Sequence, residues 1–185
     1  MKNTYKLFSI VLLAVTVVIS SCKKEDDSLI ENGCTDINAM NYSSSANTND
    51  GSCLFAYDIA QGSWNITPDC EEYTIPIVGT TISLNDQLPE TIDVQGAGNN
   101  LLYIEINGTQ VDGQIDNSGD ITVVKQTISI EVDGFGEMPI DVEGTGNIAS
   151  ASSGNMDLTY TFEIEVGPLL PAISESLECS IELDR

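Results

Sequence analysis

Apolar and polar residues alternate with a period of two over most of the chain after residue 57. Leu102, Ile104 and Ile106 alternate with tyrosine, glutamate and asparagine, and the pattern recurs over Ile128–Val132 and Tyr160–Val166. Such alternation is typical of a strand with one buried and one solvated face, and no helical period persists beyond a few residues. The sequence therefore predicts an all-β domain of antiparallel strands.

Turn signals separate the expected strands. Asn107-Gly108 and Asp133-Gly134 are dipeptides that type I′ hairpins prefer, and other glycine- and asparagine-rich stretches lie between the alternating segments. We expect about eight to ten strands in hairpin order, the last of them over Leu177–Leu183. Short turns favour an up-and-down barrel, whereas the longer connection Gly167–Ser176 keeps a two-sheet β-sandwich as the alternative.

The first 22 residues have the order of an export signal. Two lysines precede an apolar run, Leu7–Ile19, that is too short to span a bilayer, and two serines then precede Cys22. This segment resembles the lipobox of bacterial lipoproteins. The resemblance implies that residues 1–21 are removed as a signal peptide. It also implies that Cys22 then carries a diacylglyceryl thioether and an N-acyl group such as palmitate.

A charged segment, Lys23–Asp27, follows Cys22 and contains no apolar residue that could pack. We interpret residues 22–32 as a flexible acidic tether. The segment also resembles the export signal that follows the acylated cysteine in surface lipoproteins of Bacteroidota. That resemblance implies an outer-membrane lipoprotein that is exposed at the cell surface and held to the membrane through its lipid.

Four further cysteines fit an oxidising compartment outside the cytoplasm: Cys34, Cys53, Cys70 and Cys179. Four cysteines allow three pairings, and proximity favours Cys34–Cys53, which leaves Cys70–Cys179 as the second bridge. In the chain-entropy model the short loop contributes about 3 kcal/mol of stability and the long loop about 5 kcal/mol. The alternative is that these residues are free buried thiols.

The first bridge would close a module over residues 33–54. Its sequence, from Gly33-Cys34-Thr35-Asp36 to Asp50-Gly51-Ser52-Cys53, resembles a short cysteine-bounded module of exported Bacteroidota proteins. We interpret it as a disulfide-closed structural spacer, because a segment of this size cannot hold a core alone. The alternative is an irregular calcium site, with these candidate ligands: Asp36, Asn47, Asn49 and Asp50. An EF-hand does not fit, because placing Gly51 at position 6 of that loop puts Ala46 and Thr48 at ligand positions.

Charge and composition exclude several classes of function. The chain has 29 acidic and six basic residues, a net charge of −23, and therefore lacks the cations that nucleic-acid binding requires. It contains no histidine, which removes Ser-His-Asp catalysis, Cys-His catalysis and histidine-ligated zinc. We therefore expect no enzyme and no cofactor, apart from the calcium considered above.

One tryptophan, Trp64, opens the β-domain in the tripeptide Gly62-Ser63-Trp64. This tripeptide resembles the G-x-W of the first strand in lipocalin-like barrels. The resemblance implies that Trp64 closes the barrel floor and that an arginine near the last strand, here Arg185, stacks across it. A barrel of eight strands can enclose one small ligand or be filled by side chains. The candidate lining residues are Trp64, Leu102, Ile104, Ile130, Tyr160 and Phe162.

Two functions remain for such a chain. The first is non-catalytic binding of a small apolar ligand in a lipocalin-like barrel. The alternative is a structural or adhesive protein of the cell envelope that acts through its acidic surface, with or without calcium. A cavity inside the barrel favours the first function, and a filled core favours the second.

Self-repulsion of the acidic residues is expected to make the stability of the domain depend on salt. The Debye length falls from about 30 Å at 0.01 M salt to about 8 Å at 0.15 M, so added salt screens the repulsion. We expect the melting temperature to rise over this range in a thermal unfolding experiment. A melting temperature that does not change with salt would contradict this interpretation of the charge.

Overall fold

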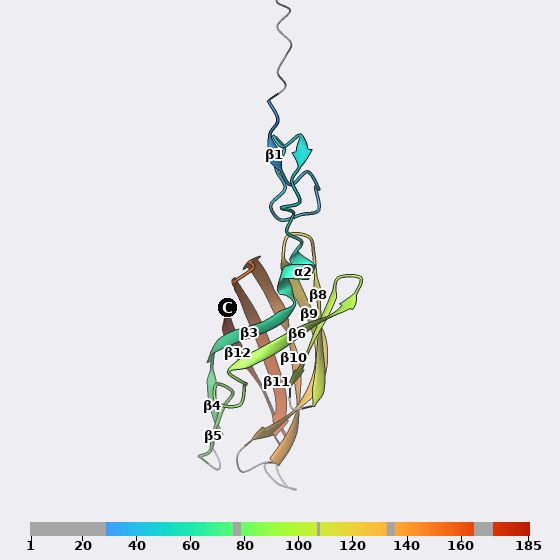
Figure 1. Ribbon diagram of the computed structural model, residues 1–185. Coiled ribbons are helices and arrows are strands. Elements are labelled where there is room, and N and C mark those ends of the chain that lie inside the picture. The colour runs from blue at the N-terminus through green and yellow to red at the C-terminus, as the bar shows by residue number, and fades with distance from the viewer. Residues whose placement is uncertain (1–28, 76–78, 107, 133–135, 165–171) are drawn as a thin grey trace, which may run out of the picture. The chain divides into compact units, whose positions relative to one another are not determined.

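The alternating segments form the wall of a closed antiparallel barrel (Figure 1). The computed structural model describes residues 29–75, 79–106, 108–132, 136–164 and 172–185, the side chains of residues 131 and 132 excepted. Each barrel strand pairs antiparallel with the next one along the chain, and the last strand pairs with the first. Within these ranges the barrel consists of eight strands: β3 (Gly62–Cys70), β6 (Thr91–Gly98), β7 (Leu101–Ile106), β8 (Thr109–Ile115), β9 (Asp120–Val132), β10 (Gly136–Ser150), β11 (Ser153–Ile164) and β12 (Ile173–Asp184). The prediction of an all-β up-and-down barrel is therefore confirmed, and these strands do not form the alternative sandwich.

The period of two places hydrocarbon inside the barrel and carboxylates outside it. On β12, Leu177, Cys179, Ile181 and Leu183 are buried, whereas every residue between them is exposed. β3, β7 and β8 follow the same rule, and most of the buried side chains come from isoleucine, valine and leucine. Because burying apolar area is the main favourable term in folding, this alternation also sets the register of each strand.

Pairing of β3 with β12 closes the barrel. The ladder runs from Cys70 opposite Cys179 to Asn65 opposite Asp184. The disulfide Cys70–Cys179 lies at one end of this ladder, and at the other end Asn65 Nδ2 donates a hydrogen bond of 2.7 Å to Asp184 Oδ1. The second predicted disulfide, Cys34–Cys53, is also present, so both predicted pairings are confirmed.

A short hairpin inserted between β3 and β6 lies at one end of the barrel (Figure 1). It consists of β4 (Glu72–Thr74) and β5 (Thr81–Ser83). Its apolar residues join the barrel core, because Ile75, Ile82 and Leu84 are fully buried. Its Tyr73 ring also lies 6.3 Å from the ring of Phe162, measured between centroids. The hairpin therefore fills this end of the barrel with side chains.

The cysteine-bounded module precedes the barrel and contains a short parallel pair, β1 (Asn32–Gly33) and β2 (Thr48–Asn49). The module packs on the barrel: Met40 contacts the barrel core, and Asn117 Nδ2 donates a hydrogen bond of 3.0 Å to Asn38 Oδ1. Asn32–Arg185 accordingly form one compact unit. The spacer interpretation of the module is not tested by this packing.

The signal peptide, the acylation of Cys22 and most of the proposed tether fall outside the described residues. They stay predictions from the sequence. In the ranges that the structure describes, no helix has both the length and the apolar character needed to cross a membrane.

Removal of the closing disulfide is expected to destabilise the barrel more than removal of the module's disulfide. The Cys70–Cys179 bridge spans 109 residues, whereas Cys34–Cys53 spans 19. We expect Cys70→Ala with Cys179→Ala to lower the unfolding free energy by about 4–5 kcal/mol, and Cys34→Ala with Cys53→Ala to lower it by about 3 kcal/mol. Urea unfolding followed by tryptophan fluorescence measures both losses. An equal loss in the two variants would contradict a dominant role for the closing bridge.

Candidate ligand-binding cavity

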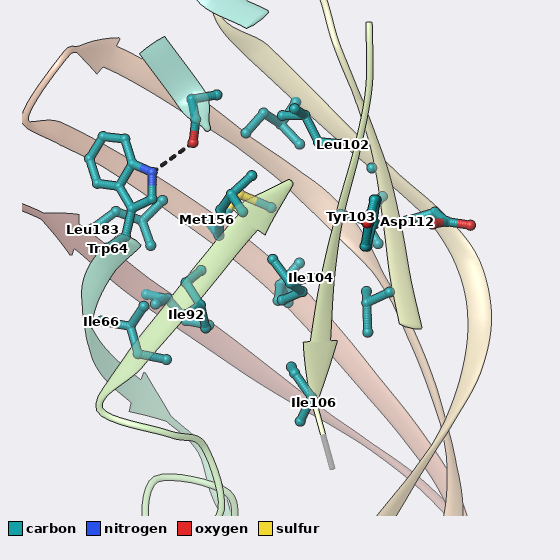
Figure 2. Close-up of a pocket in the computed structure, with 18 of the residues that line it drawn as sticks. Trp64, Ile66, Ile92, Leu102, Tyr103, Ile104, Ile106, Asp112, Met156 and Leu183 are labelled. Atoms are coloured by element: carbon teal, nitrogen blue, oxygen red, sulfur yellow. Dashed lines mark hydrogen bonds between the residues drawn. The ribbon is translucent and has the colours of Figure 1, made fainter. Parts of the chain in front are cut away.

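An apolar cavity of about 110 Å³ lies inside the barrel, beside Trp64 (Figure 2). All eight barrel strands contribute residues to its lining, and nearly all of these residues are hydrocarbon. Figure 2 shows Met156 beside the tryptophan, and Ile66, Ile92 and Ile104 below it, all around the cavity. Most of the lining comes from the alternating positions that the sequence assigns to the interior.

Four of the six predicted lining residues border this cavity: Trp64, Leu102, Ile104 and Tyr160. The other two, Ile130 and Phe162, are buried but lie outside the lining. Ile130 pairs with Met138 on the adjacent strand, and Phe162 pairs with Ile140. Both lie in the part of the barrel that the β4–β5 hairpin fills. Alternation identifies an inward side chain correctly, but it does not reveal which part of the interior is already occupied.

A glycine on an inward position helps to leave the cavity empty. On β8, Val111, Gly113 and Ile115 share the inward parity, and Gly113 has no side chain to place there. A Cβ atom at Gly113 would lie 3.4 Å from the Cγ2 of Ile121 and 3.7 Å from that of Val123, which is ordinary van der Waals contact. The backbone therefore does not require glycine here. Sequence reasoning missed this residue, although its parity within an alternating strand was a usable signal.

Trp64 lies at one end of the cavity, where it is bonded to the short helix α2 (Ala56–Ala60) that comes directly before β3. The indole Nε1 donates a hydrogen bond of 2.7 Å to the carbonyl oxygen of Ala60, and the side chain is 1 % exposed. The apolar ring is therefore buried, and its N–H has a hydrogen-bond partner, as a buried tryptophan requires.

Arg185, the residue that follows β12, stacks on the Trp64 ring at this end of the barrel. Its guanidinium carbon lies 3.8 Å from the centroid of the Trp64 ring. Its Nη2 donates hydrogen bonds to the carbonyl oxygens of Gln61, at 2.6 Å, and Ala60, at 3.3 Å. The stacking of an arginine on the tryptophan, which the lipocalin-like resemblance implied, is thus present. It ties the C-terminus of the chain to the start of β3.

Tyr160 is the cavity residue with a buried ionisable group. Its side chain is 2 % exposed, and burial raises the pKa of its hydroxyl to about 12. The hydroxyl therefore keeps its proton at neutral pH and can both donate and accept a hydrogen bond.

A second hollow, of about 410 Å³, lies against the wall where β6 and β7 separate. The two strands pair only near their shared turn, from Gln95 onward. The hollow shares Leu88, Ile92 and Ile106 with the inner cavity, and its rim includes polar and acidic residues. The inner cavity and the outer hollow therefore border the same part of the wall.

The four candidate calcium ligands use their oxygens in local turns. Asp36, Asn49 and Asp50 each accept a hydrogen bond of 2.9 Å from the backbone N–H two residues later. Asn47 accepts one of 3.1 Å from the Thr48 hydroxyl. In the described part of the chain, no group of three or more acidic, cysteine or histidine residues is placed to hold a metal ion. The calcium interpretation stays a prediction.

No known family model matches the chain, and no curated protein is similar to it. A solved structure described as a redesigned β-barrel matches 70 % of this chain and 94 % of its own, with 13 % sequence identity and a TM-score of 0.35.

Loss of the arginine is expected to weaken the closed end of the barrel. We expect Arg185→Ala to lower the unfolding free energy by about 1–2 kcal/mol, because it removes a cation–π contact and hydrogen bonds to two carbonyls. Arg185→Lys is the matched control, because it keeps the positive charge but loses the planar guanidinium group. Its unfolding free energy should lie between those of the Arg185→Ala variant and the original chain. Urea unfolding followed by Trp64 fluorescence measures the difference. Equal stability of the alanine variant and the original chain would contradict this role.

Proposed function

We propose that the barrel binds a small apolar ligand in the cavity beside Trp64, without catalysing a reaction. The observation that carries the proposal is a hydrocarbon-lined space of about 110 Å³ among the inward side chains of the barrel. Cores normally leave few voids larger than a water molecule, because an empty space costs stability. Cavities of about 150 Å³ with aliphatic and aromatic linings stay dry and bind benzene or xenon.

The size of the cavity limits the ligand. Pockets for drug-sized molecules measure roughly 300–1,000 Å³, so a large pigment or a sterol does not fit inside this cavity. A group the size of one ring fits. The filled core that the structural or adhesive alternative predicts is found in the half of the barrel next to β4 and β5.

We also propose that this binding takes place at the outside of a bacterial cell, on a protein that is anchored through an acylated Cys22. The leader, the lipobox-like residues and the charged segment after Cys22 support this location. Two disulfides agree with an oxidising compartment.

Benzene is a suitable first probe, because Trp64 borders the cavity and is the chain's one tryptophan. We expect benzene to shift the emission of Trp64 and to raise the melting temperature as its concentration increases. Gly113→Val should weaken benzene binding at least about tenfold, because the new side chain occupies the cavity.

Gln114→Val is the matched control, because it adds the same side chain to the next residue of β8, which faces solvent. It should leave benzene affinity unchanged. Equal benzene affinity in the Gly113→Val and Gln114→Val variants would place the binding elsewhere. No binding of benzene to the unmodified chain at all would overturn the proposed function.

A further inference from the structure

Tyr160 lines the cavity from an inward position of β11 and carries a hydroxyl among lining side chains that are nearly all apolar. Its β11 position pairs with Val142 of β10 and Leu177 of β12, and both of these side chains are buried and apolar. Tyr103 and Asp112 also border the cavity, but their polar groups lie outside the wall. The Tyr103 hydroxyl donates to Gln95 Oε1 at 2.8 Å, and Figure 2 shows Asp112 pointing away from the cavity.

The Tyr160 hydroxyl makes no hydrogen bond in the described structure, where the fully enclosed polar side-chain atoms all have partners. The unpaired Tyr160 hydroxyl therefore keeps some accessible surface although the residue is only 2 % exposed, and the cavity that Tyr160 lines is a space that this hydroxyl can face. Natural proteins rarely leave a buried hydroxyl unpaired, because its interaction with water is lost without replacement.

Water is a poor partner for this hydroxyl. A buried water molecule typically needs two to four polar partners, and apolar cavities stay dry. Apart from the Tyr160 hydroxyl, the inward lining offers hydrocarbon, the weakly accepting thioether of Met156 and the indole N–H of Trp64, which already bonds to the Ala60 carbonyl oxygen. A ligand that brings its own polar atom, fixed on a hydrocarbon body, satisfies both the hydroxyl and the cavity.

A carboxylate does not meet this requirement. No lysine or arginine is among the described lining residues, and the chain has no histidine, so a buried negative charge would have no counter-charge. The outer hollow, moreover, has Asp93 and Glu105 on its rim. An uncharged oxygen avoids both penalties.

We infer that the ligand of the proposed binding function carries one hydroxyl or carbonyl oxygen on a small hydrocarbon body, and that this oxygen hydrogen-bonds to the Tyr160 hydroxyl inside the cavity. The inference rests on the proposed function and narrows it. It makes Tyr160 the residue that sets ligand specificity, whereas the remaining lining residues supply apolar contact.

Two probes of the same ring size test the inference on the full chain. Cyclopentanone carries a carbonyl oxygen that accepts a hydrogen bond, and cyclopentane lacks it. Dissociation constants for both are measured by Trp64 fluorescence with the original chain and with Tyr160→Phe, which removes only the hydroxyl. The matched control is Tyr103→Phe, which removes a hydroxyl from the outer face of the same wall.

We expect the preference for cyclopentanone over cyclopentane to fall about fivefold or more in Tyr160→Phe and to stay unchanged in Tyr103→Phe. Binding of cyclopentane itself should stay the same or strengthen in Tyr160→Phe. An equal preference in all three proteins would overturn the inference but leave the proposed binding function standing. No binding of either probe to any of the three proteins would overturn both.

Discussion

Closure of the sheet is the constraint on which the rest of the structure depends. An open eight-stranded sheet would expose unpaired backbone groups along β3 and β12, and pairing these two strands removes both edges. Closure also converts the apolar face of every strand into one shared interior. The disulfide Cys70–Cys179 and the stacking of Arg185 on Trp64 lie toward opposite ends of this one seam. The residues that close the barrel thus also form one end of its cavity.

The interior is divided into a filled part and an empty part. Near β4 and β5, large side chains such as Tyr73, Ile75 and Phe162 occupy the space between the strands. Toward α2, Gly113 contributes no side chain at an inward position, and Trp64 spans the opening as a lid whose N–H is bonded to the helix. A barrel of eight strands is just wide enough for either outcome. A few residues therefore decide whether it becomes a packed core or a binding cavity.

Local patterns in the sequence predict much of this architecture, and non-local packing limits the rest. Alternation and turn dipeptides predicted the barrel strands, because side-chain parity depends on neighbouring residues alone. Proximity and compartment predicted both disulfides. Ile130 and Phe162 were predicted to line the cavity, yet they lie in the filled part, because the hairpin that occupies it comes from a segment between β3 and β6 with little alternation of its own. The parity of Gly113 marks an inward position without a side chain, but whether that position borders a cavity depends on the opposing residues, which the sequence does not specify.

The alternation that folds the barrel also accounts for its proposed selectivity. Outward positions carry acidic residues on nearly every strand, so the outer surface repels anions at long range. The outer hollow at the β6–β7 gap adds Asp93 and Glu105 on its rim to these acidic residues. Inward positions are hydrocarbon, where the loss of water penalises a charge of either sign. An anion is thus opposed by Coulomb repulsion outside and by desolvation inside, whereas an uncharged molecule with one oxygen meets neither barrier and finds a partner in Tyr160.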